Sequence, residues 1–138
     1  MDSLTVETAL FEYREPKPHF INPNCFGEDF AAWLRERVAG FASEGFEISA
    51  PIQEDYGWGF WISRARDTFW VAISFVEQLD GGAGAQWVVS VAYDPGLSII
   101  RRLFHQPDQT ALARIREALW GALRTTEGIR IVEEPEER

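Results

Sequence analysis

The sequence offers little support for a disulfide, a metal site or a membrane span. Its 138 residues include a single cysteine, Cys25, which cannot form a disulfide within the chain. The two histidines, His19 and His105, have no second His, Cys or carboxylate at the helical or turn spacing of metal ligands. No apolar run approaches the roughly 20 residues of a membrane-spanning helix. We therefore expect no metal, no cofactor and no membrane contact.

Signals for export and for division into domains are also missing. Residues 1–4 lack the basic stretch followed by an apolar stretch that opens a secretory signal, which, with the single cysteine, favours the cytoplasm. The length is near the commonest size of one domain, and no repeat or linker divides the chain. We expect one domain over residues 1–132 and a disordered acidic tail over residues 133–138.

Lysine is nearly absent, since 12 of the 13 basic residues are arginine. The formal net charge is −9, and residues 1–60 hold 11 acidic but only 4 basic side chains. A surface of this sign repels phosphate backbones, so we expect no nucleic-acid partner. A local cluster of Arg101, Arg102, Arg114 and Arg116 lacks interleaved exposed aromatic residues, which favours a solvated or salt-bridged face over nucleic-acid binding.

Two stretches have the spacing of amphipathic helices. Phe30, Leu34, Val38 and Phe41 follow one helical stripe, which predicts a helix over residues 28–43. Gly45 is placed to end it in the left-handed conformation. Pro107 and Asp108 precede a second helix over residues 109–125, whose stripe is Leu112, Ile115, Leu119, Ala122 and Leu123.

Strict alternation of apolar residues predicts a meander of three antiparallel strands over residues 58–63, 69–76 and 86–93. The register that keeps the two faces consistent sets Trp61 opposite Trp70 and Ile62 opposite Phe69. Strands over residues 3–13 and 46–51 extend the sheet, the latter at an edge because of Pro51.

The expected element order is β-α-β-β-β-β-α, with a further short strand over residues 129–132 and a short helix or irregular segment over residues 97–104. This order predicts an α+β fold of two layers, in which two main helices cover one face of an antiparallel sheet.

The two faces of the predicted meander differ in character. One is uniformly large and apolar, as a core face is: Trp58, Phe60, Ile62, Phe69, Val71, Ile73, Phe75, Trp87, Val89, Val91 and Tyr93. The other is small and weakly polar apart from two tryptophans: Gly59, Trp61, Ser63, Trp70, Ala72, Ser74, Val88, Ser90 and Ala92. The second helix or residues 97–104 could cover this second face; alternatively it stays open and the two indoles form a binding hot spot.

An acidic pair, Glu54 and Asp55, precedes Tyr56, Gly57 and Trp58. Carboxylates beside aromatic walls serve as general acids in some enzymes. Adjacent residues of an extended chain point in opposite directions, however, so a solvated acidic rim is favoured over joint catalysis on one bond. The glycine-rich residues 80–84 join two strands and lack the helix N-terminus that binds phosphate. We assign no catalytic residue.

These observations favour a non-enzymatic, cytoplasmic protein-interaction module that offers an acidic and aromatic surface to a basic protein partner. A small bacterial inhibitor or immunity-type protein would have such a composition. The candidate binding residues are Glu54, Asp55, Tyr56, Trp58, Trp61 and Trp70. One alternative is a small-ligand binder or enzyme with a pocket lined by the four aromatic residues and a carboxylate of the acidic pair. Another is a homodimer through the face that holds Trp61 and Trp70.

Overall fold

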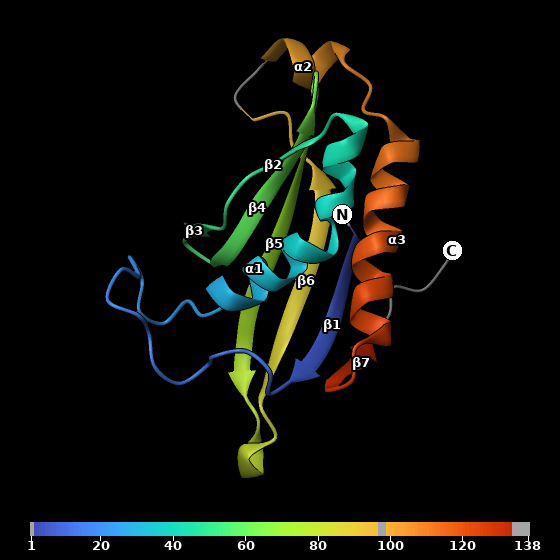
Figure 1. Ribbon diagram of the computed structural model, residues 1–138. Helices are drawn as coiled ribbons and strands as arrows, with labels where there is room; N and C mark the ends of the chain where they lie inside the picture. The colour runs from blue at the N-terminus through green and yellow to red at the C-terminus, as the bar shows by residue number, and fades with distance from the viewer. Residues whose placement is uncertain (1, 97–98, 134–138) are drawn as a thin grey trace.

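The protein has an α+β fold of two layers, a seven-stranded antiparallel sheet and a layer of helices (Figure 1). The computed structural model describes residues 2–96 and 99–133. The strand order is β2-β4-β5-β6-β1-β7, and β3 also pairs with β4. The elements are β1 (Asp2–Thr8), α1 (Glu28–Arg37), the 3-10 helix η1 (Ala39–Glu44), β2 (Glu47–Ile48), β3 (Ile52–Glu54), β4 (Gly57–Arg64), β5 (Asp67–Gln78), the 3-10 turn η2 (Asp80–Gly82), β6 (Ala85–Tyr93), α2 (Ile99–Phe104), α3 (Gln109–Thr125) and β7 (Ile129–Glu133).

The central hairpin of β4 and β5 has the register that the sequence predicts. Trp61 lies opposite Trp70 and Ile62 lies opposite Phe69. The strands are joined by the two-residue turn Ala65 and Arg66, in which Ala65 adopts a positive φ of 53°. Such a turn follows the right-handed twist of the flanking strands and so holds them in one register.

The core lies between one face of the sheet and the helices α1 and α3. Of the predicted core face, nine side chains are buried: Trp58, Phe60, Ile62, Phe69, Val71, Ile73, Trp87, Val89 and Val91. Phe75 and Tyr93 are half-buried and pack against them. The helices contribute Phe30 and Leu34 from α1 and Ile115, Leu119 and Leu123 from α3. Since each large apolar side chain contributes about 1.5–3 kcal/mol when fully buried, this cluster is the main source of stability.

The first strand is shorter than predicted. It ends at Thr8 rather than continuing to residue 13, and Leu10, which lies within the predicted range, is 54% exposed, whereas Leu4 and Val6 are buried. The Thr8 hydroxyl accepts a hydrogen bond from the Leu10 backbone N–H at 3.1 Å. This local turn competes with the strand ladder and ends it.

The first helix and the edge strand are each divided in two. The predicted helix over residues 28–43 is the α-helix α1 followed by η1, and Gly45 ends η1 in the left-handed conformation with φ 88°, as expected. The predicted strand over residues 46–51 is replaced by β2 and β3, which lie on either side of Pro51 and both pair with β4. Proline has no backbone N–H, so the ladder cannot run through it.

The C-terminal part agrees with the sequence in outline. Residues 99–104 form α2, and the start of the ambiguous segment, residues 97 and 98, lies outside the described residues. The predicted short strand is β7, which pairs antiparallel with β1. Glu133 belongs to β7 rather than to the predicted tail, and residues 134–138 lie outside the described part of the chain. Among the described residues, no helix is long and apolar enough to cross a membrane.

A substitution at Gly59 in β4 tests how tightly the sheet is packed at the tryptophan pair. A Cβ atom at this position would lie 2.3 Å from the Val71 backbone oxygen and 2.4 Å from Cζ2 of Trp70. We expect Gly59→Ala to lower the free energy of unfolding by about 1–3 kcal/mol, because backbone and indole must both shift. Urea unfolding followed by circular dichroism measures this change.

The matched control for this substitution is Gly121→Ala in the middle of α3. A Cβ atom there meets nothing within 4 Å. We expect it to raise the free energy of unfolding by about 0.5–1 kcal/mol through helix propensity. Equal effects of the two substitutions would contradict the close approach at Gly59.

Candidate functional site

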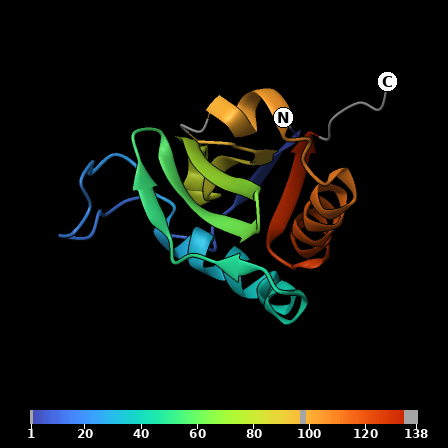
Figure 2. The same cartoon turned by 90° about the horizontal axis from the view of Figure 1, so that it is seen from above.

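The open face is the face of the sheet opposite α1 and α3, formed by Gly59, Trp61, Ser63, Thr68, Trp70, Ala72, Ser74, Gln86, Val88, Ser90 and Ala92. The second helix does not cover it, because the buried residues of α3 join the same core cluster as those of α1. Figure 2 shows α1 and α2 on opposite sides of the sheet, and in Figure 1 α2 lies beyond one end of the strands. The alternative in which α3 covers the two tryptophans is therefore wrong.

Three aromatic side chains form a continuous group on this face, the aromatic row Tyr56, Trp70 and Trp61. The indoles of Trp61 and Trp70 have ring centroids 4.8 Å apart and are tilted by 52°. The Trp70 indole Nε1–H donates a hydrogen bond to the Tyr56 hydroxyl oxygen at 2.6 Å. Both tryptophans are half-buried, whereas Tyr56 is 51% exposed. The row thus combines fixed geometry with accessible apolar surface.

The local sequence explains why the row forms. Glu54 pairs with Gly57, so Asp55 and Tyr56 are the two turn residues between β3 and β4. Gly59 has no side chain, which leaves room for the Trp70 indole to lie across β4 towards Tyr56. Trp61 is held at its backbone, since its N–H donates to the Ser49 hydroxyl and its carbonyl accepts from the Ser49 N–H, both at 2.9 Å.

Acidic residues lie on both sides of the tryptophan pair along the strands. Glu47 pairs with Ser63, two positions beyond Trp61. The Asp94 N–H donates to the Thr68 carbonyl at 2.8 Å, which places Asp94 two positions beyond Ala92, the cross-strand neighbour of Trp70. Glu54 lies at the other side, at the end of β3. We call Glu47, Glu54 and Asp94 the acidic frame.

The acidic frame acts on the aromatic row electrostatically. Burial raises the pKa of the Tyr56 phenol above its ordinary value, and the negative charges of Glu54 and Asp94 raise it further. The hydrogen bond from the Trp70 indole opposes both effects, because it stabilises the phenolate. Burial is the largest cause of this shift, and the charges of Glu54 and Asp94 act in the same direction, against an anion at Tyr56.

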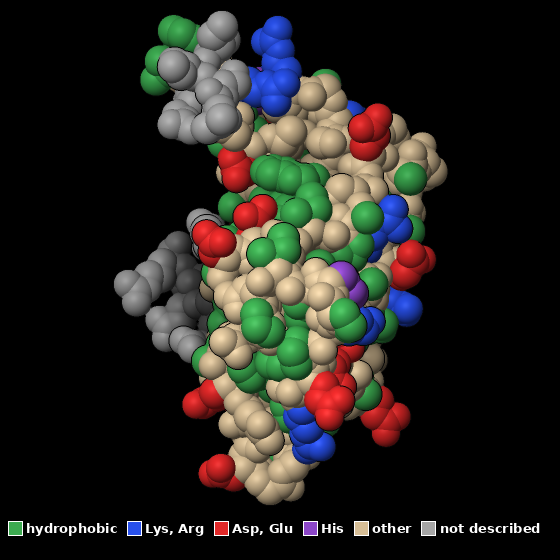
Figure 3. Space-filling model, turned by 90° about the vertical axis from the view of Figure 1, so that its left-hand side faces the viewer, with side chains coloured by type: hydrophobic (Ala, Val, Ile, Leu, Met, Phe, Trp, Pro, Cys, Tyr) green, Lys and Arg blue, Asp and Glu red, His purple; other side chains and the backbone are tan. Residues whose placement is uncertain are grey.

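No lysine or arginine occupies the open-face positions between β2 and β6. Apart from the frame, the two tryptophans and Glu77, which pairs with Gln86, the paired positions on these strands hold small, apolar or uncharged polar residues such as Ser63, Ala72, Ser90 and Val88. Figure 3 views the molecule from the side of β2 and β3 and shows hydrophobic side chains gathered next to acidic ones. The strands therefore offer aromatic surface and negative charge together.

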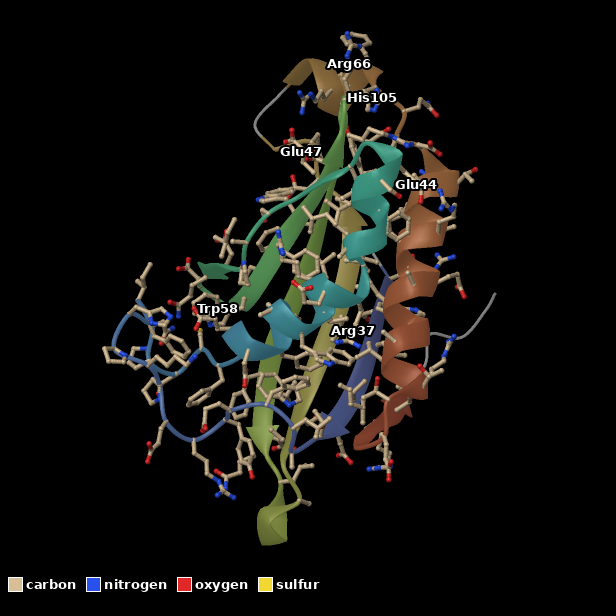
Figure 4. All side chains as sticks on the ribbon, viewed as in Figure 1. Arg37, Glu44, Glu47, Trp58, Arg66 and His105 are labelled. Atoms are coloured by element: carbon tan, nitrogen blue, oxygen red, sulfur yellow. The ribbon has the colours of Figure 1, made fainter. Side chains whose placement is uncertain are left out.

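The structure separates the six predicted binding residues. Glu54, Tyr56, Trp61 and Trp70 come together on the open face, but Trp58 lies on the opposite face of β4 and is only 4% exposed. Its indole N–H donates to the Cys25 carbonyl at 2.8 Å, and its ring lies 5.1 Å from that of Phe20. Figure 4 shows Trp58 towards the loop that precedes α1 and Glu47 along β2. A pocket that joins Trp58 to Trp61 and Trp70 is therefore wrong.

Asp55 contacts the loop before α1 through its backbone. Its side chain is exposed, and its backbone carbonyl accepts a hydrogen bond from the Cys25 thiol at 3.2 Å. Burial raises the pKa of that thiol, and the charge of Asp55 adds to the effect, so the thiol stays protonated and unreactive at neutral pH.

Two members of the acidic frame, Glu47 and Asp94, were missed by the sequence analysis. Asp94 follows from the alternation that defines the two faces of the sheet, since it continues the series Val88, Ser90 and Ala92. Extending the predicted strand past Tyr93 would have found Asp94. The place of Glu47 on this face depends on how the two-residue strand β2 pairs with β4, and a segment of two residues has no periodic pattern from which that pairing can be predicted.

The histidines form structural pairs rather than a metal site. His105 Nε2 lies 2.9 Å from Asp67 Oδ1, which joins the segment after α2 to the β4–β5 hairpin, and Figure 4 shows His105 and Arg66 at this end of the molecule. His19 Nε2 lies 2.5 Å from Glu28 Oε2 on the surface. Within the described ranges, no group of three or more His, Cys, Asp or Glu side chains could hold a metal ion.

A separate cavity of about 570 Å³ lies between η1 and α3, lined by Phe41, Gln109, Thr110, Ala113, Arg114 and Glu117. It belongs to the helical layer and shares no residue with the aromatic row or the acidic frame. Its main polar feature is the Arg114 guanidinium, which forms two hydrogen bonds to the Glu44 carboxylate at 2.5 and 2.8 Å.

Comparison with family models, with curated proteins and with solved structures found no match to the chain. The aromatic row and its acidic frame are therefore the basis on which a function can be argued.

The pKa of Tyr56 gives a direct test of the site. Because the unfolded chain releases this proton at a lower pH than the folded protein, the free energy of unfolding should fall as the pH rises above about 10, the ordinary tyrosine value. The stability that this shift contributes is fully present below the ordinary value, and it is lost as the pH rises through the higher pKa of the folded state. Tyr56→Phe should remove this part of the fall. NMR titration of ring-labelled tyrosine measures the pKa itself.

The role of the acidic frame in this shift is tested by Glu54→Gln, which should move the Tyr56 pKa towards the ordinary value. The matched control is Glu127→Gln, an exposed carboxylate in the turn after α3. A Tyr56 pKa that is equal in the wild type and in Glu54→Gln would contradict the proposed field.

Proposed function

We propose that this protein is a non-enzymatic interaction module of the cytoplasm that binds a basic protein partner through the aromatic row and its acidic frame. The observation that carries the proposal is the half-buried Trp61 and Trp70 pair in contact with exposed Tyr56, with carboxylates on both sides. An inhibitor or immunity-type role in a bacterium, in which a small acidic protein blocks a basic target, would use such a surface.

The aromatic row has the features of a binding hot spot. Tryptophan and tyrosine are enriched where truncation to alanine costs most binding energy, and they combine large apolar area with few rotatable bonds. In this row the Trp70 orientation is already fixed by the hydrogen bond to Tyr56 and by the space above Gly59. Little side-chain entropy would therefore be lost on binding.

Charge supports a basic partner over an acidic one. The chain has a formal net charge of −9, and the carboxylates of the acidic frame lie beside the row. A negative patch attracts a positive partner during diffusional encounter and opposes like-charged competitors.

The alternatives receive less support from the same geometry. Glu54 and Asp55 are exposed, whereas a general acid needs a desolvated site, and Trp58 is on the other face of the sheet. A symmetric homodimer through the open face would bring the acidic frames of two copies together, and like charges that face one another destabilise pairing.

Affinity capture from the organism that holds this chain tests the proposal. We expect the wild type to retain a basic protein, identified by mass spectrometry, and Trp70→Ala to weaken its capture by about 30-fold, the effect of a hot-spot residue worth about 2 kcal/mol. Glu54→Lys should weaken it as well, because it reverses one charge of the frame without removing core packing.

The matched control is Glu127→Lys, which makes the same charge change in the turn after α3 and should leave capture unchanged. Circular dichroism establishes that each variant keeps its fold. Capture that is equal for the wild type, Trp70→Ala and Glu54→Lys would overturn the proposal, whatever protein is retained.

A further inference from the structure

We infer that the partner contributes an arginine side chain, which lies against the Trp61 and Trp70 indoles and pairs with a carboxylate of the acidic frame. This inference rests on the proposed function and narrows it from a basic surface to one kind of side chain. It follows from three properties of the site: the shape of the indole pair, the spacing of the carboxylates and the way this chain binds its own arginines.

The indole pair leaves ring surface for a planar cation. Since the two rings are tilted by 52° at a centroid distance of 4.8 Å, neither can cover the face of the other as parallel stacking would. Both side chains are half-buried, so part of each remains accessible. A cation over the face of tryptophan is attracted by the ring quadrupole, and guanidinium can also stack on the ring because it is planar.

The acidic frame lies at the distance that an arginine placed on the rings requires. Trp61, Trp70 and Ala92 lie side by side on neighbouring strands. Glu47 and Asp94 lie two residues further along the strands from this set. Two residues of a strand span about 7 Å, which the reach of carboxylate and guanidinium together can bridge. Glu54, on the other side, is close enough to raise the pKa of Tyr56. A guanidinium over the indoles can therefore use its fork of N–H donors on a carboxylate of the frame.

The helical layer of this chain contains the same combination within one molecule. The Arg114 guanidinium carbon lies 5.3 Å from the centroid of the Phe41 ring, while the same side chain forms two hydrogen bonds to Glu44. Arg64 lies 4.1 Å above the Phe46 ring and donates to the Glu44 carbonyl. An aromatic ring next to a carboxylate or carbonyl oxygen is thus a built arginine site in this protein, and the open face repeats it with larger rings.

Lysine fits the site less well for physical reasons. Its ammonium group is compact and strongly hydrated, cannot stack as a plane and cannot form the two parallel hydrogen bonds of a guanidinium. We therefore expect the site to prefer arginine over lysine, and to ignore a neutral side chain of the same shape.

Titration of the ¹⁵N-labelled protein with capped tri-arginine, tri-lysine and tri-citrulline peptides tests this. Tri-arginine should shift the indole N–H signals of Trp61 and Trp70, assigned with Trp61→Phe and Trp70→Phe, and leave that of the buried Trp87 in place. Tri-lysine should bind about 2- to 5-fold more weakly, because lysine lacks the planar stacking and the two parallel hydrogen bonds of guanidinium. Tri-citrulline, which keeps the shape without the charge, should not bind.

The frame is tested in the same experiment by Glu54→Gln combined with Asp94→Asn, which should weaken tri-arginine binding, while Glu117→Gln on α3 should not. Equal binding of tri-lysine, binding of tri-citrulline, no shift at millimolar peptide, or shifts in every indole alike would each overturn the inference. If partner capture depends on Trp70 and Glu54 but the peptides show no arginine preference, the inference fails and the proposed function stands. If capture is also unaffected, both fail.

Discussion

The alternation of side chains along β4 and β5 is the constraint on which the rest of the structure depends. One face of this hairpin carries Phe60 and Val71 into the core, and the other carries Trp61 and Trp70 outward. Because the period is two residues, a slip of one position would bury the outward set and expose the core set. The apolar burial that stabilises the protein therefore also fixes the tryptophan pair, and fold and site share one register.

The sequence was a good guide wherever a periodic pattern was long, and a poor one at the ends of elements. The central register and the ladder pair of Trp61 with Trp70 follow from alternation, and the fold class follows from alternation together with the two helical stripes. The end of β1 depends on one hydrogen bond from Leu10 to the Thr8 hydroxyl, which propensity cannot foresee. Trp58 lies on the core face, as the alternation predicts, and its closeness in sequence to Glu54 does not bring it to the binding surface, because its side chain points to the other side of β4.

Charged groups in this protein are held in two ways, by side-chain ion pairs and by the backbone pairing of the strands that carry them. Arg114 of α3 pairs with Glu44 of η1, and Arg116 of α3 pairs with Asp2 of β1, at partly exposed positions where such pairs contribute little to stability because water screens them. Glu47 and Asp94 are placed relative to the indoles by the backbone pairing of their strands, and the Asp94 carboxylate also accepts a hydrogen bond from the Gly96 N–H at 2.7 Å. Groups carried by paired strands keep their spacing better than groups on loops, which suits recognition of a defined shape.

The interrupted edge beside β4 is poorly suited to strand addition. β2 and β3 are only two and three residues long, and Pro51 between them has no N–H to offer. An extended peptide that added here as an extra strand would find few backbone groups to pair with, as short and proline-broken edges generally ensure. A partner of the proposed kind that bound at this side of the molecule would therefore be recognised by its side chains, and so by its sequence rather than by its ability to form a strand.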